Sequence, residues 1–340
     1  MKKRRLLTLI GSICIVLALA MALPAPSQAR EQVAIEILSM GFGGSGYVAS
    51  FALSDLINKH SPWLRATCIQ TGGSIENLKT LNAEPKRRKN TIIYGSWIAP
   101  YLSSKGLPPF TAKYGGARAL SLAMNVVCFF ATLDPNIKTG KDIAGKRVGF
   151  PPKASIGYIN QQMVMKYAWN VWDTIKKEFL GWTACINALR DGMVDVAIAN
   201  PIMAGDTALP NPALVELLAG AKKVYWIPIT EDDLKIVREK SGYPLGRSLV
   251  CPAGALGPKQ PNAVEGGRAV NNWWADVEFP NDAAYEVCRI IKEHYKAFWP
   301  YHASLKGLNP EMMGKAGSQE SYFHPGAVKF YKEQGLKIGW

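Results

Sequence analysis

Two successive units of strand, glycine-containing loop and helix constrain the fold more than any other feature of this sequence. Each unit begins with an apolar run typical of a buried strand, continues through a loop of glycine and hydroxyl residues, and ends in a helical pattern. The strands are predicted over 33–39 and 65–70, and the helices over 47–59 and 75–81. Strands joined through helices form parallel sheets with helices on their faces, so the pattern predicts an α/β fold.

The remainder of the chain contains further elements of the same kinds. Additional strands are predicted over 91–94, 119–124, 126–132, 146–150 and 194–199, with strand and loop again near 247–255. Additional helices are predicted over 96–105, 158–169, 183–190, 231–240 and 282–298, and the C-terminal third is expected to be mostly helical.

A break at residues 134–136 separates two sets of α/β units and suggests two lobes. We expect the first lobe to comprise residues 30–133 and 251–340 and the second to comprise 134–250, with a hinge where the chain crosses near 133 and 250. The final helices would then pack back on the first lobe. Clefts between domains are common sites for small ligands, so this organisation predicts a cleft.

The first 29 residues have the features of a cleavable export signal. Four basic residues precede an apolar run from Leu6 to Leu23, and two prolines then lead to Ser27-Gln28-Ala29, which places small residues at the −3 and −1 positions of a signal-peptidase site. The apolar run approaches the length that spans a bilayer, so an uncleaved anchor is the alternative. We expect cleavage after Ala29 and a periplasmic mature protein.

Charge and cysteine content argue against nucleic-acid binding and against a metal site. The net charge is +14, and it becomes +10 once the four basic residues of the export signal are removed. The remaining charges are scattered, and their one cluster, residues 86–89, is typical of a solvated turn. Five cysteines remain; we expect them to be buried, with one long-range disulfide possible. The four histidines lie far from the cysteines and never at ligand spacing, so we expect no metal and no cofactor.

The first glycine loop matches the dinucleotide pattern GxGxxG without supporting a nucleotide site. Such a site requires an acidic residue near the end of the second strand, where this chain has Gln70 and Thr71. Both glycine loops instead direct backbone N–H groups to helix starts, where the helix dipole is positive, and Ser45, Thr71 and Ser74 add hydroxyl groups. This predicts a carboxylate or phosphate site, although the glycines could serve only the tight turns.

Several segments occur in an order found in one family of binding proteins. They are residues 43–47, Thr-Gly-Gly-Ser-Ile-Glu-Asn-Leu at 71–78, Asp-Ile-Ala-Gly-Lys-Arg-Val at 142–148, Asp-Gly-Met-Val-Asp at 191–195, and His-Pro-Gly-Ala with Tyr-Lys-Glu-Gln-Gly at 324–335. With them, almost the whole mature chain resembles the TAXI group of substrate-binding proteins of TRAP (tripartite ATP-independent periplasmic) transporters. The resemblance implies a type II periplasmic binding protein, with two α/β lobes, a hinge and an interlobe cleft. It would be a monomer that delivers a small anionic organic ligand, usually a carboxylate, to a sodium-driven TRAP-type membrane permease.

The resemblance places ligand-binding residues on both sides of the cleft. In the first lobe these are Ser45, Gly46, Tyr47, Thr71, Gly73, Ser74, Tyr94, Ser96 and Trp97, and in the second lobe Ser155, Gly157, Tyr158 and Asn200. Two segments depart from the family pattern. Lys153 and Ile156 stand in the loop 151–157, which is usually Gly-x-x-Gly-Ser-Gly, and a basic turn occupies 84–90. The ligand's identity therefore stays open.

Three further points stay open at this stage. Lys153, Arg118 or Arg247 could assist the anion. An ABC-type receptor for a sulfonate, a phosphonate or a thiamine precursor is an alternative, as is the sensor domain of a signalling system. An exported enzyme is disfavoured, because Ser45 lies in Gly-Gly-Ser-Gly-Tyr rather than in a GxSxG elbow, and no histidine lies on a predicted strand-end loop.

Overall fold

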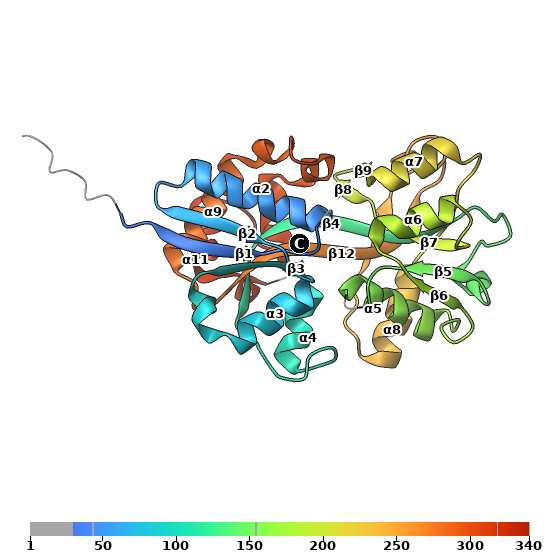
Figure 1. Cartoon of the computed structure of the whole chain (residues 1–340), viewed down its shortest axis with the longest axis horizontal. Helices are drawn as coiled ribbons and strands as arrows, with labels where there is room; N and C mark the ends of the chain where they lie inside the picture. Colours follow the sequence, from blue (N-terminus) through green and yellow to red (C-terminus); the bar gives the residue numbers. More distant parts are fainter. Residues whose placement is uncertain (1–29, 43, 154, 318, 340) are drawn as a thin grey trace, which may run out of the picture.

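The computed structural model describes residues 30–339 except 43, 154 and 318. The predicted export signal, residues 1–29, lies outside the described residues. Two lobes lie side by side, and two long strands, β4 and β12, run through both (Figure 1). Within the described part of the chain, no helix is both long enough and apolar enough to cross a bilayer.

The strands include the predicted ones in order, together with several short additions in the second lobe and the long strand β12, which was not predicted. They are β1 (Val33–Leu38), β2 (Leu64–Ile69), β3 (Thr91–Ser96), β4 (Ala117–Thr132), β5 (Arg147–Phe150), β6 (Lys176–Phe179), β7 (Val196–Ala199), β8 (Ile202–Ala204), β9 (Thr207–Leu209), β10 (Tyr225–Ile227), β11 (Ser248–Cys251) and β12 (Val264–Asp276).

Seven α-helices begin within two residues of their predicted starts: α2 (Ser45–His60), α3 (Ser74–Ala83), α4 (Ile98–Lys105), α5 (Ile156–Met163), α6 (Trp182–Arg190), α8 (Glu231–Ser241) and α9 (Asn281–Glu293). Helix α7 (Pro212–Gly220) was not predicted, and α10 (Pro310–Met313) and α11 (Pro325–Glu333) lie in the C-terminal third that was expected to be mostly helical. A π-helical turn, η3 (Val164–Ala168), continues α5. Short 3₁₀ turns include η1 (Pro85–Lys89), η2 (Gly140–Ile143), η4 (Tyr295–Phe298), η5 (Ala303–Gly307), η6 (Gly314–Ala316) and η7 (Glu320–Tyr322).

Each lobe contains a group of parallel strands, as the repeated units predict. In the first lobe β1 lies between β2 and β3 and is parallel to both. In the second lobe β5 lies between β6 and β7 and is parallel to both. In the first lobe, α2 lies on one side of the sheet and α3 and α4 lie on the other (Figure 1). In a parallel sheet each strand is joined to the next by a helix that crosses over one face. Successive crossovers can use opposite faces, so helices cover both.

Strand β4 joins the two lobes. Nearly all of its residues are buried, which is typical of a strand covered on both faces, and the two strands predicted at 119–124 and 126–132 form this one element. Residues 117–128 of β4 pair with β12, and residues 129–132 pair with β7 of the second lobe. The lobe limits at residues 133 and 250 stay a prediction.

Strand β12 replaces part of the predicted helical C-terminal third. Its sequence contains glycines and asparagines, which disfavour strands when they are judged by local propensity. The strand forms because it pairs with β4 on one side and with β3 and β11 on the other. Gly266 permits the close approach, since a Cβ atom there would lie 2.5 Å from the carbonyl oxygen of Cys128.

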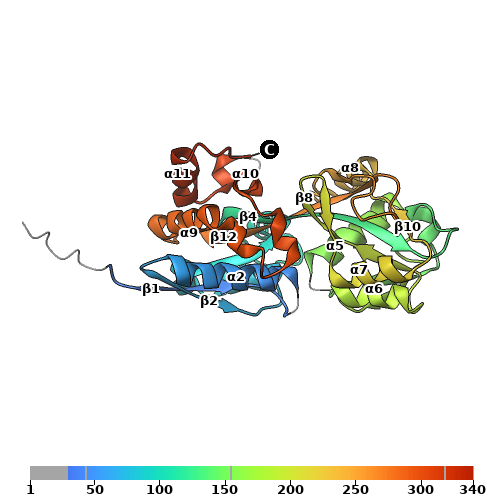
Figure 2. The same ribbon diagram turned by 90° about the horizontal axis from the view of Figure 1, so that it is seen from above.

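The C-terminal helices pack on the first lobe. The buried stripe of α9 includes Val287, Ile290 and Ile291, which are fully buried, as the helical periodicity predicts. Helix α11 packs on α9 (Figure 2). The predicted helix over 282–298 is divided, because α9 ends at Glu293 and η4 follows. All five cysteines of the described chain are unpaired, and three of them are fully buried.

Candidate ligand-binding site

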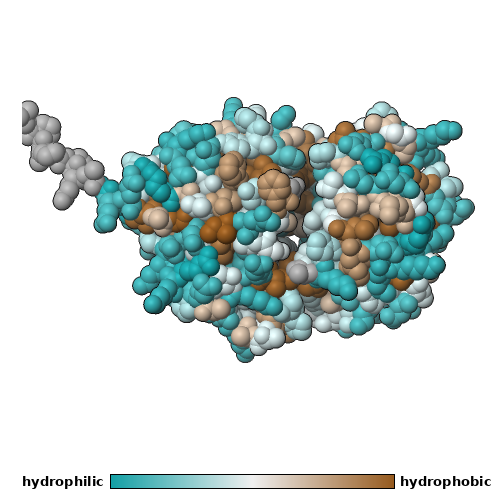
Figure 3. All heavy atoms as spheres, viewed as in Figure 1, coloured by the Kyte–Doolittle hydropathy of each residue, from teal (hydrophilic) through white to brown (hydrophobic). Residues whose placement is uncertain are grey.

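A cavity of about 220 Å³ lies between the two lobes. The space-filling view shows a hollow at this position, with apolar side chains at its edge (Figure 3). Its walls come from both lobes and from the two connecting strands. From the first lobe, β4 and β12 they include Met40, Gly44, Ser45, Gly73, Ser74, Tyr94, Ser96, Val126, Cys128, Arg268 and Asn271; from the second lobe they include Ser155, Gly157, Asn160, Gln161, Trp182, Asn200, Ile202, Leu209, Asn211, Leu234 and Leu245.

Five helices begin at this cavity. Their first residues, or the residues just before them, line its wall in α2, α3, α5, α6 and α7. The N-terminus of a helix carries a partial positive charge, because its first N–H groups have no partner within the helix. The ends of α2, α5, α6 and α7 create a positive potential in this space, whereas Glu76 in the first turn of α3 offsets the contribution of that helix. The arrangement therefore favours an anion over a cation.

The start of α2 is closely packed against the end of β3. A Cβ atom at Gly46 would lie 2.3 Å from Cε1 of Tyr94, so only glycine fits at this position. Gly44, which precedes the helix, receives no side-chain cap, and it lines the cavity together with Ser45. The first glycine loop therefore leads the backbone to the cavity, as predicted, although Gly43 lies outside the described residues.

The N–H groups of the second glycine loop donate hydrogen bonds to side chains of the protein itself. The N–H of Gly72 donates to Oε2 of Glu76 at 2.7 Å, and that of Gly73 donates to Oγ1 of Thr71 at 3.1 Å. Gly73 has φ 105°, a conformation that other residues adopt only with strain. Ser74 accepts a hydrogen bond from the N–H of Ser96 at 3.0 Å. Glu76 adds a negative charge to this helix start, so the loop is less suited to an anion than its sequence predicts.

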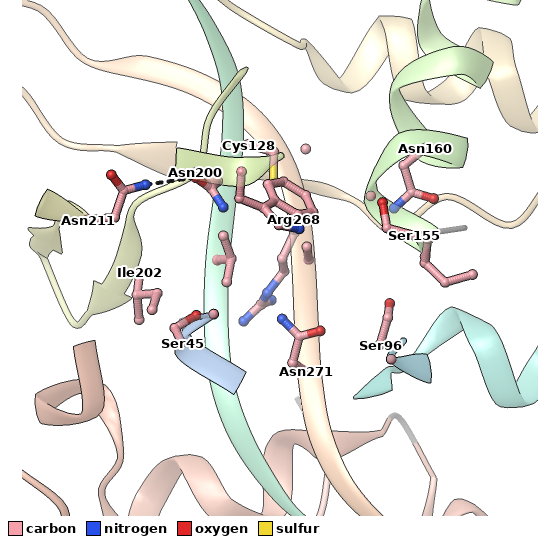
Figure 4. A pocket seen from close by; sticks show the side chains of 18 of the residues that line it. Ser45, Ser96, Cys128, Ser155, Asn160, Asn200, Ile202, Asn211, Arg268 and Asn271 are labelled. Atoms are coloured by element: carbon pink, nitrogen blue, oxygen red, sulfur yellow. Dashed lines mark hydrogen bonds between the residues drawn. The ribbon is translucent and has the colours of Figure 1, made fainter. Parts of the chain in front are cut away.

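In the second lobe, α5 begins with Ser155 as its cap. The Oγ of Ser155 accepts a hydrogen bond from the N–H of Tyr158 at 3.2 Å. Gly157 lies against the ring of Trp182, and a Cβ atom there would be 2.2 Å from that ring. Asn200 follows β7, and its Oδ1 accepts a hydrogen bond from Nδ2 of Asn211 at 3.4 Å (Figure 4).

Among the described residues that line the cavity, Arg268 is the only arginine, and the lining contains no lysine, aspartate or glutamate. It lies on β12, and its side chain projects into the cavity towards Asn271 (Figure 4). Its Nε donates to Oδ1 of Asn125, 2.9 Å away on the neighbouring strand β4, which fixes the plane of the guanidinium. Burial lowers the pKa of Arg268 to about 10, because removal from water disfavours the charged form. The group is still positive at neutral pH.

The structure brings eight of the thirteen predicted site residues to the cavity wall. These are Ser45, Gly73, Ser74, Tyr94, Ser96, Ser155, Gly157 and Asn200. The other five lie beside the wall or away from it. Gly46 packs against the ring of Tyr94, and the hydroxyl of Thr71 donates a hydrogen bond to the backbone oxygen of Ser39 at 2.9 Å. A role of any of these thirteen residues in binding stays a prediction.

The remaining three predicted residues contact aromatic or loop neighbours. Tyr47 stacks edge-on with Phe42, at 5.3 Å between ring centroids. Tyr158 packs against Phe150, Trp172 and Phe179. Trp97 is part-buried, and its ring faces Gly246 of the loop that precedes β11.

The cationic residues suggested from the sequence lie elsewhere. Nη1 of Arg118 donates to the backbone oxygens of Gly115 and Ala117, and Arg247 is exposed. Lys153 is exposed and lies over the ring of Phe179, 4.4 Å from its centroid. Arg268 was not among the predicted site residues, because the C-terminal third was predicted to be mostly helical. A signal was present, since Arg268 is the one charged residue in the run 266–275.

The fold and the position of the cavity define a class of protein. Two α/β lobes that are joined by shared strands and enclose a ligand-sized cavity form the type II periplasmic-binding-protein fold, so the predicted fold class is confirmed.

The chain belongs to the NMT1-like family, whose profile matches residues 37–335. Among solved structures it is similar to MatC from Rhodopseudomonas palustris with bound malate, at 12% identity over 89% of this chain and 96% of that chain, with a TM-score of 0.50. It is also similar to the periplasmic binding protein BugD (12% identity, 90% and 98% coverage, TM-score 0.49) and to the periplasmic aliphatic sulphonate binding protein SsuA from Escherichia coli (14%, 81% and 79%, 0.43).

Proposed function

We propose that this protein is an extracytoplasmic solute receptor that binds a small anionic organic ligand, of which a carboxylate is the favoured type, in the cavity between its lobes. The observation that carries the proposal is the guanidinium of Arg268, which is held by Asn125 inside a cavity where five helices begin. A guanidinium presents N–H donors in a planar fork that matches a carboxylate. The helix starts add a positive potential to the positive charge of Arg268.

The energetics favour an anion at this place. A hydrogen bond to a charged group contributes about 1.5–3 kcal/mol, and each helix start contributes about 0.3–1 kcal/mol to an anion near it. A bound anion also interacts favourably with the partly desolvated charge of Arg268. Ser45, Ser96 and Asn271 provide polar side chains around the same space.

Binding is coupled to closure of the two lobes. The lining residues come from both lobes, so a ligand that contacts all of them stabilises the closed arrangement over the open one. Strands β4 and β12 join the lobes, and we place the hinge on these two strands, near the point where β4 ends its pairing with β12 at Cys128 and begins its pairing with β7 at Phe129. The receptor needs no chemical step, and we assign it no catalytic residue.

We further propose export through residues 1–29 and delivery of the ligand to a sodium-driven TRAP-type permease. The ordered motifs of the TAXI type support this partner, and the two-lobed fold suits it. Uptake assays in cells that carry this protein and its neighbouring transporter genes test the proposal. Uptake that requires a sodium gradient supports a TRAP partner, whereas uptake that requires ATP hydrolysis would identify an ABC importer instead.

Ligand binding is tested with the purified mature protein and Arg268→Gln. A small carboxylate at 100 times its Kd should stabilise the wild-type protein by about 2.7 kcal/mol, which a thermal-shift assay detects. Arg268→Gln should lose this response. Arg247→Gln is the matched control, because it removes an exposed arginine outside the cavity and should keep the response. The receptor proposal fails if a library of carboxylates, sulfonates and phosphonates leaves the wild-type protein unchanged.

A further inference from the structure

The wall that the second lobe contributes is rich in apolar side chains from separate elements. Val164 comes from η3, Ile202 from β8, Leu209 from β9, Ile229 from the loop after β10, Leu234 from α8 and Leu245 from the loop before β11. Because six elements converge, this surface is not the face of one amphipathic helix. It offers a ligand a place to bury apolar atoms, and burial of apolar surface is the main non-directional source of affinity.

The cavity has one positive charge and, among its described lining residues, no aspartate or glutamate. A ligand with an ammonium group would therefore bury a charge without a carboxylate partner. A second carboxylate would likewise lack a charged partner, since Arg268 is the only lysine or arginine among the described lining residues. His302 also lines the cavity, and its Nδ1 is engaged with Oγ of Ser304 at 2.7 Å. Burial of an unpaired charge is strongly unfavourable.

The volume limits the size of the ligand. An engineered cavity of about 150 Å³ binds benzene, which has six heavy atoms. On that scale, 220 Å³ holds about nine heavy atoms. A carboxylate of six carbons has eight.

We propose that the ligand is an amphiphilic monoanion: one acidic head group, bound by Arg268, and an uncharged, largely apolar body of about five to six carbons, bound by the wall of the second lobe. This inference rests on the proposed receptor function and specifies the ligand class of the same site. It sets this chain apart from receptors for dicarboxylates and amino acids, because the cavity neutralises one charge only. Asn160, Asn200 and Asn211 also line the cavity, and their side-chain amides can form hydrogen bonds with one uncharged polar substituent of the ligand.

Four ligands of matched length test the inference by calorimetric titration of the wild-type protein. Hexanoate has the predicted chemistry, adipate adds a second carboxylate, 2-aminohexanoate adds an ammonium group, and hexanamide removes the charge. We expect hexanoate to bind at least about 30-fold more tightly than each of the other three. Affinity should also rise about three- to fourfold for each methylene from butanoate to hexanoate.

Two variants locate the two halves of the ligand. Arg268→Gln should abolish the preference for hexanoate over hexanamide, while Arg247→Gln should preserve it. Leu209→Ala, at a half-buried wall position, should reduce the gain from butanoate to hexanoate and leave the acid-over-amide preference in place. Circular dichroism of each variant confirms that it is folded.

The outcomes separate this inference from the receptor proposal. Equal or tighter binding of adipate or 2-aminohexanoate would overturn the monoanion class and leave an anion receptor. The same holds if all four ligands fail while inorganic phosphate or ethanesulfonate binds. If no anion binds at all, both proposals are wrong.

Discussion

Replacement of Arg268 by glutamine should weaken binding without weakening the free protein. Most substitutions of part-buried residues destabilise a fold by about 1 kcal/mol. Arg268 differs because burial lowers its pKa from its ordinary value to about 10, which means that the folded state disfavours its charge. A neutral side chain of similar length removes this unfavourable contribution.

The magnitude follows from that pKa. A lowering of this size corresponds to roughly 3 kcal/mol at about 1.4 kcal/mol per pKa unit, and screening by solvent at a part-buried site reduces it to about 1–2 kcal/mol. Loss of the hydrogen bond from Nε to Asn125 offsets about 1 kcal/mol of this gain. We therefore expect a free energy of unfolding that is unchanged or raised by about 1 kcal/mol, and a Tm that is unchanged or higher by about 1–2 °C for a chain of this length.

Differential scanning calorimetry of the ligand-free protein measures this effect directly. Arg268→Lys provides the comparison, because it keeps a positive charge at the same place and should gain nothing. Removal of any ligand that copurifies, by partial unfolding and dialysis, precedes the scan. A Tm for Arg268→Gln more than about 4 °C below the wild-type value would refute the reasoning, since it would show that the charge stabilises the ligand-free fold.

Two further predictions concern the fold. Gly266→Ala should lower the free energy of unfolding, measured in urea, by about 1–3 kcal/mol, because the new Cβ atom would lie 2.5 Å from the carbonyl oxygen of Cys128. Gly267→Ala is the control and should change this free energy by less, because the nearest atom to its Cβ would be 3.8 Å away. Equal effects of the two substitutions would contradict this packing. Burial lowers the pKa of His324 below its ordinary 6.5, so the unfolded chain takes up a proton first and stability present above pH 6.5 should fall as the pH drops below it. His324→Asn keeps an acceptor for the N–H of Gly326 and should reduce that pH dependence, although His294, whose pKa is also lowered, sustains part of it; an unaltered pH profile would count against this role.

The local patterns of the sequence were sufficient for the N-terminal part of the first lobe. The two strand–loop–helix units predicted from residues 33–81 correspond to β1, α2, β2 and α3, because apolar strands and helix starts are encoded within each segment. The glycine loops were predicted to lead to a shared cavity, and Ser45 and Ser74 do line it together. Local sequence could not show that Glu76 supplies an acceptor for the second loop.

The long strand β12 was outside the reach of local patterns. Its glycines and asparagines reduce strand propensity, and its conformation is set by β3 and β4, which lie more than a hundred residues earlier in the chain. Arg268 was missed for the same reason. Whether an arginine is desolvated depends on what surrounds it after folding, and here those neighbours come from β4 and from the second lobe.

The proposal that an acidic head group binds to Arg268 is tested most directly by a crystal structure of the protein grown with hexanoate. We predict that the lobes close on the ligand, with its carboxylate about 2.7–2.9 Å from the guanidinium nitrogens of Arg268 and its carbon chain against Leu209, Leu234 and Leu245. A carboxylate bound away from Arg268, or a chain that points to solvent, would contradict the account.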